Sequence, residues 1–330
     1  MNALYALFVV ILLLLVAWIG IGTVNLHILF GIVLPYLAFA IFVLGFFYRI
    51  IKWAGSPVPF RIPATCGQQK SLPWIKNSKL DNPHNAFWTI IRMALEILTF
   101  RSLFRSTRAE LRDDQRIAYG DTKWLWAGAL AFHWTFLIII LRHYRFFAEP
   151  VPGFVLFLQN IDGLFQVGLP VVYITDAVIV LAATYLFIRR VFIPQVRYIS
   201  LFADYFPLFL IGGIAVTGIL MRYFTKVDVS AVKELTLGWI NFNPVAPEGI
   251  GIMFYLHLFL VSVLFAYFPF SKLMHMGGIF LSPARNLANN NRARRHVNPW
   301  NYDVKTHTYE EYEDEFRDVM KEAGMPLEKE

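Results

Sequence analysis

Six long blocks of apolar residues constrain the fold of this chain more strongly than any other feature of its sequence. Each block approaches the roughly 20 predominantly apolar residues needed to cross the hydrocarbon core of a bilayer. The blocks cover residues 3–23, 26–48, 124–141, 167–188, 205–221 and 249–270. Because backbone polar groups in lipid must form hydrogen bonds within their own segment, each block is expected to form a helix. The sequence therefore predicts an all-α integral membrane protein with six transmembrane helices in a bundle.

The composition agrees with this class of protein. Of the 330 residues, 57% are hydrophobic and 16% are charged, against about 45–50% and about 25% in soluble domains. These proportions exclude an ordinary soluble enzyme and a disordered protein. The single cysteine, Cys66, also excludes an internal disulfide and an iron–sulfur cluster held by this chain alone.

The basic residues are divided unevenly between the two sides of the predicted bundle. Of 30 Lys and Arg residues, 25 lie in segments 49–123, 189–203 and 272–330, and five lie in 142–166 and 222–248. Because the richer side is normally cytoplasmic, both termini are expected in the cytoplasm and the protein in the cytoplasmic (inner) membrane. No basic segment precedes the first block, which is expected to remain as an uncleaved anchor. The net charge of +7 is thus attributed to topology rather than to nucleic-acid binding.

The alternation of apolar and polar segments divides the chain into four parts. Residues 1–53 form an N-terminal transmembrane hairpin, 54–122 a cytoplasmic linker, 123–285 a four-helix membrane core and 286–330 a polar cytoplasmic tail. The tail carries ten acidic residues from Asp303 onward. Because such a segment buries little apolar surface, we expect it to be extended or to lie on a partner.

Within the linker, residues 86–104 have the periodicity of an amphipathic helix. Its apolar face contains Phe87, Ile90, Ile91, Ala94, Leu95, Leu98 and Leu103. Arg92, Glu96 and Arg105 lie away from that face. Such a helix suits the plane of the membrane interface or the surface beneath a partner subunit, and the sequence leaves both interpretations open.

Four of the eight histidines lie in, or at the ends of, two predicted spans. His133 and His143 belong to the third span, and His257 and His275 belong to the sixth span and the residues just after it. An ionisable side chain within a membrane is costly and is functional by default. A single histidine in an apolar helix is more often a hydrogen-bonded packing residue, but two helices that each carry two histidines indicate shared ligand sites.

Haem iron is the metal centre that these histidines fit best. Neutral imidazole is the commonest metal ligand, and helix bundles build cofactor sites from side chains on facing helices. Zinc is normally accompanied by carboxylate or thiolate ligands, which neither span offers. In antiparallel helices, His143 faces His257 near the outer side, and His133 faces His275 near the inner side. The sequence therefore predicts a dihaem cytochrome with two axial histidines per haem and a role in electron transfer.

The spacing of the histidines requires a break in the sixth helix. The ten-residue step from His133 to His143 rises about 15 Å, whereas the eighteen-residue step from His257 to His275 rises about 27 Å. Straight helices cannot satisfy both pairs equally. Because Pro269 lies between the last two histidines, we expect it to kink or end the helix and to bring His275 back toward its partner.

The histidine pattern resembles that of the nitrate reductase gamma-subunit family. The residues that carry this resemblance are Phe132-His133, His143, His257, Phe268-Pro269-Phe270-Ser271-Lys272-Leu273-Met274-His275 and Ser282-Pro283. The similar region covers roughly residues 120–285 and a helix that begins at Leu26. The resemblance implies that the four histidines hold two b-type haems.

The linker is similar to that of one branch of this family. The stretch Arg61-Ile62-Pro63-Ala64-Thr65-Cys66-Gly67-Gln68-Gln69 and the linker length resemble the DsrM branch, which belongs to the sulfite-reduction-associated DsrMKJOP complex. The cytochrome b subunit of heterodisulfide reductase is similar too. This resemblance implies a menaquinol oxidoreductase subunit that passes electrons from menaquinol on the outer side to a cytoplasmic iron–sulfur subunit of the DsrK type. Other membrane and outer-side subunits would complete the complex, and the direction of electron flow stays open.

The same resemblance points to further site residues. Arg142 at the outer end and Lys272 at the inner end are candidates for binding the haem propionates, although either can be an ordinary interface anchor. The quinol-site candidates are Asp162, Gln166, Asp176 and His27. Asp176 either accepts a quinol proton or bonds to neighbouring backbone. The family places a lysine near its outer haem, around position 163, and this chain has none there.

Two other classes of function stay open from the sequence. The first is a proton-coupled transporter or channel, in which Asp176 and the intramembrane histidines form a proton relay. The second is a structural anchor for a complex, which binds no cofactor. A red detergent extract with a Soret band discriminates a haem protein from both.

Overall fold

The computed structural model describes residues 1–56, 67–111, 116–165, 170–247, 249–292 and 305–329. Within these residues, five helical segments are long and apolar enough to cross a membrane. The five segments are built on α1 (Asn2–Gly22), α2 (Leu34–Ala54), α5 (Lys123–His143), α9 (Phe202–Leu220) and α11 (Ile252–Tyr267). A π-helical turn precedes α2 (Leu29–Val33) and another follows α9 (Met221–Thr225). A 3-10 turn follows α5 (Tyr144–Phe146) and another follows α11 (Phe268–Phe270). Five of the six predicted spans therefore correspond to helices of the required length and apolarity.

The fourth predicted span differs in its start and in its charge. Gly163–Phe165 (β3) pairs antiparallel with Val172–Tyr173 (β4), and only then does α7 begin, at Ile174–Phe192. The predicted start at residue 167 was wrong, because the backbone before α7 is used in ladder hydrogen bonds. The helix α7 carries an aspartate and two arginines and is not one of the five apolar segments, yet it packs between α5 and α9.

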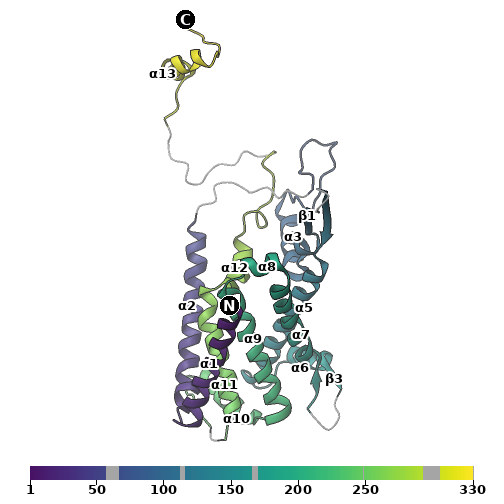
Figure 1. Ribbon diagram of the computed structural model, residues 1–330, viewed down its shortest axis with the longest axis vertical. Helices are drawn as coiled ribbons and strands as arrows, with labels where there is room; N and C mark the ends of the chain where they lie inside the picture. Colours follow the sequence, from purple (N-terminus) through teal and green to yellow (C-terminus); the bar gives the residue numbers. More distant parts are fainter. Residues whose placement is uncertain (57–66, 112–115, 166–169, 248, 293–304, 330) are drawn as a thin grey trace.

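Shorter elements lie at the two ends of the bundle (Figure 1). One end, called here the linker end, holds α3 (Ala86–Thr99), α4 (Arg101–Phe104), the hairpin of β1 (Thr107–Leu111) and β2 (Ile117–Asp121), α8 (Pro194–Ile199), 3-10 turns at Lys272–Met274 and Ile279–Leu281, and α12 (His275–Gly278). The opposite end, called the α10 end, holds α6 (Gly153–Asp162), the β3–β4 hairpin and α10 (Val229–Ile240). The C-terminal segment carries α13 (Tyr309–Glu322).

The helices pack as a series of neighbours from α5 through α7 and α9 to α1 and α11, and α2 lies along α11. Three clusters of buried apolar side chains hold this series together. Leu210 and Leu260 are fully buried where α1, α9 and α11 meet, and Leu235 with Tyr255 forms the centre of a cluster that joins α10 to α11. Ile179 is buried between α5, α7 and α9. The helices α5 and α11 are thus connected through α7 and α9 rather than packed on each other.

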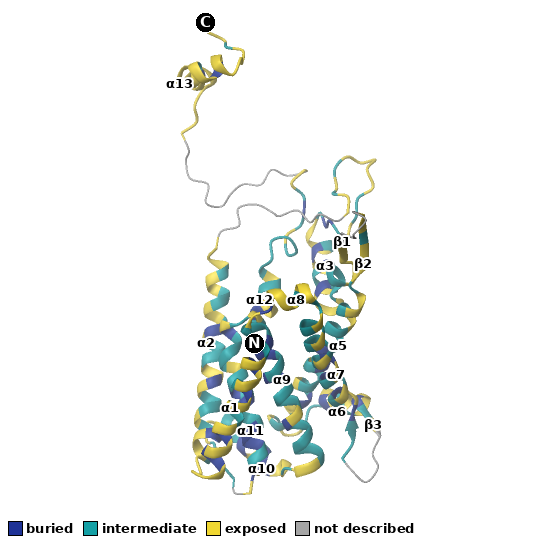
Figure 2. Ribbon diagram, in the orientation of Figure 1, coloured by how far each residue is buried: buried dark blue, intermediate teal, exposed yellow. Residues whose placement is uncertain are grey.

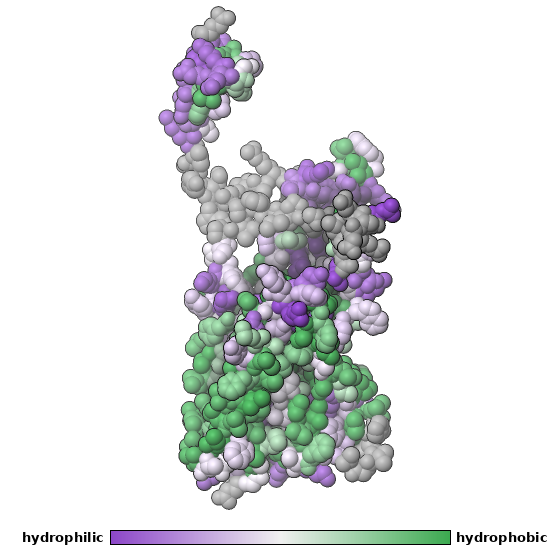
Figure 3. Space-filling model, in the orientation of Figure 1, coloured by the Kyte–Doolittle hydropathy of each residue, from purple (hydrophilic) through white to green (hydrophobic). Residues whose placement is uncertain are grey.

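Large apolar side chains cover the outside of the bundle. Phe8 on α1, Leu44 on α2 and Leu181 on α7 are 62%, 72% and 67% exposed. Figure 2 shows exposed residues along the outer faces of these helices, and Figure 3 shows an apolar belt below the hydrophilic linker end. Because an apolar surface of this extent is unfavourable in water, the exterior of the bundle fits a bilayer.

The amphipathic helix predicted in the linker is interrupted at Phe100. This residue has φ +50°, so it ends α3 and starts α4, and the prediction of one continuous helix was wrong at this position. The polar and apolar faces of α3 are also reversed from the arrangement usual in a soluble protein. Arg92 and Glu96 are 7% and 5% exposed, whereas Phe87 and Ile90 are 63% and 67% exposed. The polar face therefore packs on the protein, and the apolar face points outward.

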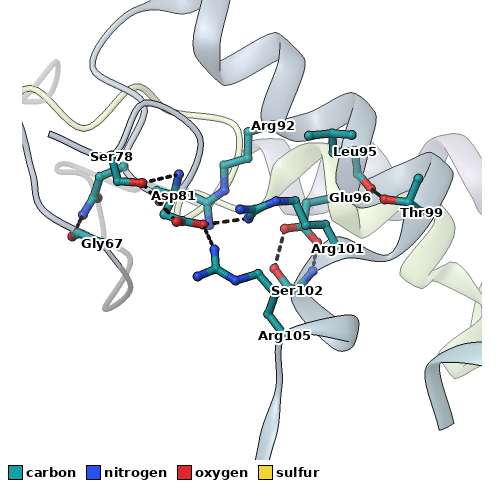
Figure 4. Close-up of polar contacts among 11 residues, drawn as sticks. Gly67, Ser78, Asp81, Arg92, Leu95, Glu96, Thr99, Arg101, Ser102 and Arg105 are labelled. Atoms are coloured by element: carbon teal, nitrogen blue, oxygen red, sulfur yellow. Dashed lines mark hydrogen bonds and ion pairs between the residues drawn. The ribbon is translucent and has the colours of Figure 1, made fainter. Parts of the chain in front are cut away.

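Polar contacts hold the buried face of α3 to the preceding linker (Figure 4). Arg92 donates a hydrogen bond to the backbone oxygen of Asp81 at 3.0 Å. The Asp81 carboxylate accepts from Arg101 at 2.7 Å and also pairs with Arg105. Burial acts to raise the pKa of this carboxyl group, but hydrogen bonds from Arg105, Arg101 and Ser78 outweigh burial and lower the pKa to about 2.

The acidic tail contains a helix, where an extended chain was predicted. The Thr308 hydroxyl accepts from the N–H of Glu311 at 3.2 Å, and the Glu311 carboxylate accepts from the N–H of Thr308 at 3.0 Å. This reciprocal cap stabilises the start of α13. The buried Glu313 carboxylate accepts the N–H groups of Glu328 and Lys329 at 2.7 and 3.0 Å. The extended alternative was wrong for these residues because the cap and the folded-back C-terminus stabilise a helix locally, and contact of the tail with a partner stays a prediction.

Candidate haem-binding site

Two of the four predicted ligands lie on α5, where the helix itself orients both imidazoles. The Nδ1 atom of His133 lies 2.7 Å from the carbonyl oxygen of Ala129, and the Nδ1 atom of His143 lies 2.7 Å from that of Ile139. In each case the acceptor is four residues earlier, on the preceding turn of the helix. Both rings are therefore held by the backbone of their own helix.

The other two ligands lie on either side of a break in the last helix of the bundle. After α11, a 3-10 turn at Phe268–Phe270 is followed by Ser271 in an extended conformation, and α12 begins at His275. Because proline lacks an N–H and its ring clashes with the preceding turn, the helix ends where Pro269 was expected to end or kink it. The break predicted at Pro269 is confirmed.

The structure brings His143 together with His257, and His133 together with His275. In the first pair, at the α10 end of α5, the ring centroids are 6.4 Å apart and the ring planes are 11° apart. In the second pair, toward the linker end, the centroids are 5.9 Å apart and the planes 86° apart. Both pairs are in contact distance despite their unequal spacing along the chain.

Hydrogen bonds at Nδ1 leave the Nε2 atom of each imidazole free to bind a metal. The Nδ1 atom of His275 lies 2.9 Å from the carbonyl oxygen of Lys272, and a carbonyl oxygen can only accept, so this nitrogen carries the proton. The same argument applies to both histidines of α5. The Nδ1 atom of His257 lies 2.9 Å from the Thr217 hydroxyl, whose own hydrogen bond reaches the Gly213 carbonyl at 2.8 Å. Metal-binding histidines are commonly held in this way.

The ring separations fit one iron between the members of each pair. A metal–imidazole bond of about 2.0–2.1 Å on each side, with about 1 Å from nitrogen to ring centre, separates two opposed ring centroids by about 6 Å. The observed 6.4 and 5.9 Å agree. The side chains of His133, His143 and His275 are exposed, so protein side chains leave space beside them. Among the described residues, no group of three or more His, Cys, Asp or Glu is arranged to hold a metal ion.

A buried network of charges lies beside the pair at the α10 end. The guanidinium of Arg142, 8% exposed, lies 2.9 Å from Asp162 and 3.5 Å from Asp176. Asp162 also accepts the N–H and the hydroxyl of Thr175, at 2.9 and 2.6 Å. Asp176 accepts the Tyr223 hydroxyl at 2.7 Å. Arg142 is therefore paired with two carboxylates of this chain, and its role with a haem propionate stays a prediction.

The corresponding cation at the linker end is also paired. The Nζ atom of Lys272 donates to Asp204 at 2.7 Å, and Arg190 lies 3.7 Å from the same carboxylate. Because the Lys272 carbonyl accepts from His275, this ion pair anchors the residue that orients a predicted ligand. A role of Lys272 with a propionate stays a prediction.

The last two quinol-site candidates differ in what the structure describes. The ring of His27 packs against Tyr255, with centroids 5.0 Å apart. Its Nδ1 atom is buried and forms no hydrogen bond with the part of the chain that the structure describes. Gln166 and Cys66 lie outside the described residues.

Three residues that were not predicted from the sequence lie close to the ligands. Thr217 contacts His257, Asp204 holds Lys272, and the Phe100 ring meets the His133 ring edge-on at 5.0 Å. A hydroxyl in an otherwise apolar span is the one signal that could have singled out Thr217. The others depend on the placement of helices that are far apart in the sequence.

Comparison with known proteins identifies the family of the chain. The model of the nitrate reductase gamma subunit matches residues 92–294, which include all four histidines. The chain belongs to the nitrate reductase gamma-subunit family. It is 47% identical over 280 residues to the Hdr-like menaquinol oxidoreductase cytochrome b-like subunit of Archaeoglobus fulgidus, and the aligned residues cover 83% of each chain. It is 41% identical over 274 residues to the protein of the same name from Archaeoglobus profundus, and the aligned residues cover 81% of each chain.

These comparisons confirm the resemblance predicted from the histidine spacing. The match begins at residue 92, so His27 and the hairpin of α1 and α2 lie outside the family region.

Proposed function

We propose that this protein is the membrane dihaem cytochrome b subunit of a menaquinol oxidoreductase. It links menaquinol at the α10 end to a cytoplasmic iron–sulfur subunit of the DsrK type at the linker end, in a sulfite-reduction or heterodisulfide-reductase-like system. The enzyme is the whole complex, and this chain is its quinol-oxidising subunit. Both relatives are named as cytochrome b-like subunits of an Hdr-like menaquinol oxidoreductase, which supports the proposal.

One observation carries this proposal. In each of two imidazole pairs the ring centroids are separated by a distance that fits one iron atom, 6.4 and 5.9 Å, and the Nδ1 atom of every ring already forms a hydrogen bond. His143 and His257 would hold one haem, and His133 and His275 the other. Haem b supplies a one-electron couple when bound. Two histidines on each haem iron would leave no free position for oxygen, so the proposed role is electron transfer rather than oxygen binding.

Other residues of the chain orient the predicted ligands. Backbone carbonyls and Thr217 fix the imidazole tautomers. Apolar side chains of α5, α7 and α9 pack together beside the predicted ligands, and a low-dielectric surrounding strengthens the polar contacts within it. Arg142 offsets part of the negative charge of Asp162 and Asp176 beside the pair at the α10 end, which lowers the cost of burying these groups.

The proposed orientation places the linker end in the cytoplasm. The segments with 25 of the 30 Lys and Arg residues end or begin at this side of the bundle, and positive charge favours the cytoplasmic side. The helix α7, with Leu181 exposed and neighbours on both sides, is proposed as the sixth span. Both termini are then cytoplasmic, in the cytoplasmic membrane.

His27 is the strongest of the proposed quinol-site residues. Both carboxylates among the candidates already accept hydrogen bonds from this chain: Asp162 from Thr175, and Asp176 from Tyr223. The Nδ1 atom of His27 is buried without a partner among the described residues. A buried polar atom of this kind is costly until a ligand supplies its hydrogen bond, and a quinol hydroxyl is such a ligand.

The linker end offers a surface for the acceptor subunit. Asn289 of the tail donates to Asn82 of the linker at 2.7 Å, so two segments 207 residues apart form one surface near the second histidine pair. The outward apolar face of α3 supports its proposed position in the membrane interface. An iron–sulfur partner would dock on this linker and tail surface.

The test is a haem-to-protein ratio combined with a redox titration of the purified subunit. The wild-type protein is expected to bind two haems, and His143→Ala is expected to lose one of them. His84→Ala, a histidine of the linker outside both pairs, is the matched control and should keep two. Unchanged haem content in His143→Ala would refute the proposed pairing. A colourless wild-type protein would instead favour a transporter or an anchor.

A further inference from the structure

The four predicted ligands are held by different kinds of acceptor at Nδ1. Three of them donate to backbone carbonyls, of Ala129, Ile139 and Lys272. Only His257 has a side-chain acceptor, the hydroxyl of Thr217 at 2.9 Å, and the backbone carbonyl of Ile214 also contacts this imidazole. A backbone carbonyl is present whatever the side chain is, so among these four contacts only the one from Thr217 depends on the identity of a side chain.

The hydroxyl of Thr217 is oriented to accept rather than to donate at the histidine. Its oxygen lies 2.8 Å from the Gly213 carbonyl and 3.0 Å from the Ile214 carbonyl. Both carbonyl oxygens can only accept, so the hydroxyl hydrogen points back into α9. The oxygen is then free to accept the Nδ1–H of His257, which leaves Nε2 unprotonated.

The next residue of α9, Gly218, lies close to the same imidazole. A Cβ atom on Gly218 would lie 3.3 Å from Cε1 of His257 and 3.7 Å from its Nδ1. The ring of His257 therefore approaches the backbone of α9 closely at two successive residues. Thr217 supplies a hydrogen bond, and Gly218 supplies room.

We propose that Thr217 is a positioning residue for His257 that sets the redox potential of the haem at the α10 end. The proposal rests on the proposed function, because it requires His257 to bind iron. An acceptor at Nδ1 makes an imidazole more basic, and a more basic ligand stabilises ferric over ferrous iron. Removing the acceptor therefore raises the midpoint potential of this haem and leaves the other haem unchanged.

The planes of the imidazoles allow the two haems to be told apart. The rings of the pair at the α10 end are nearly parallel, at 11°, and those of the second pair are nearly perpendicular, at 86°. Low-spin ferric iron with parallel imidazoles gives a rhombic EPR signal, and perpendicular imidazoles give a signal dominated by one large g value. A potentiometric titration followed by EPR thus assigns each midpoint to one haem.

The variants are chosen to separate the hydrogen bond from packing. Thr217→Val keeps the shape of the side chain and removes the oxygen, whereas Thr217→Ser keeps the oxygen. Ser262 is the matched control, because its buried hydroxyl also bonds the carbonyl four residues earlier, that of Leu258 at 2.8 Å, and forms no hydrogen bond with a histidine among the described residues. Gly218→Ala adds a methyl group in close contact with the His257 ring and removes no hydrogen bond.

The experiment is an EPR-monitored redox titration of the full-length protein and these variants in detergent. Loss of a partner at a metal-binding histidine typically changes affinity about 10-fold or more. A 10-fold preference for the ferrous state corresponds to about 59 mV for a one-electron couple. Thr217→Val is expected to raise the midpoint of the rhombic signal by this order, Thr217→Ser to stay close to wild type, and Ser262→Ala to change neither haem. Gly218→Ala is expected to shift the rhombic signal alone.

The outcomes distinguish this proposal from the proposed function. If the wild-type protein contains two haems and Thr217→Val moves neither midpoint, or moves only the large-g signal, the role of Thr217 is refuted while the dihaem function stands. If Thr217→Val loses the rhombic haem and Thr217→Ser retains it, positioning by the hydroxyl is supported. Loss of that haem in both variants refutes the proposal in favour of packing. A wild-type protein without haem refutes the proposed function itself.

Discussion

A methyl group added at Gly45 tests whether α2 supports the break that places His275. Gly45 lies in the buried face of α2, and a Cβ atom there would lie 2.7 Å from Cβ and 2.9 Å from Cγ of Pro269. Non-bonded carbon atoms prefer about 3.5–4.0 Å, so the two segments must separate by about 0.8 Å. Neither a proline ring nor a helix backbone relaxes easily, because both have few free torsions.

The expected cost follows from this overlap. Overpacking a core typically destabilises a protein by about 1–3 kcal/mol. Replacing glycine by alanine within a helix offsets up to about 1 kcal/mol of this cost. Gly212 of α9 provides the matched control, because its Cβ atom would have no other atom within 4 Å. The difference between Gly45→Ala and Gly212→Ala therefore isolates the overpacking.

The assay combines thermal unfolding in detergent with haem content. At about 2–4 °C per kcal/mol, Gly45→Ala is expected to unfold several degrees below Gly212→Ala. Displacement of Pro269 moves the 3-10 turn between His257 and His275, so the haem at the linker end is expected to be lost first. If Gly45→Ala matches Gly212→Ala in melting temperature and retains both haems, the idea that α2 supports the break is wrong.

Two further predictions concern charged residues. Arg142→Met leaves the buried Asp162 and the half-buried Asp176 without their cation and is expected to cost about 3–5 kcal/mol, measured as a loss of melting temperature. Arg145→Met, which removes a neighbouring arginine with no ion pair among the described residues, is the control and should cost less than about 1 kcal/mol. The low pKa of Asp81, about 2 against 3.8, means that its contacts contribute stability above pH 4, which is lost as the pH falls from about 4 to 2, by about 2 kcal/mol in total. In the wild type, the hydrogen-exchange rate of the α3 amides, normalised to an unstructured peptide, should rise as the pH falls from about 4 to 2. Asp81→Asn should show fast exchange at every pH. A wild-type rate that does not change over this range would contradict the role of the Asp81 carboxylate in holding α3.

Much of the fold was accessible from the sequence because it depends on neighbours along the chain. Long uncharged blocks predicted five helices that match the apolar segments of the structure, and Pro269 predicted the break before His275 because proline acts on its own helix turn. The four histidines were identifiable because charged or polar side chains are rare in such blocks. The start of α7 was wrong, since a short ladder between two segments competes with the helix.

The arrangement around the ligands was not accessible in the same way. The α3 face that contains Arg92 reads as a solvated face, yet it packs on the protein through a contact with Asp81, eleven residues earlier. The pairing of Arg142 with Asp162 and Asp176 joins the ends of three helices. A hydrogen bond between Thr217 and His257 spans 40 residues.

The sequence by itself determined that this chain forms apolar helices and that four histidines lie in, or just beyond, two of its apolar blocks, because helix formation and burial in lipid are dictated by local composition. Only the tertiary structure decided the angle between the imidazoles of each pair and which groups hold them. Those properties depend on the rotation and depth of one helix relative to another. Packing between distant segments sets both, and no local pattern encodes them.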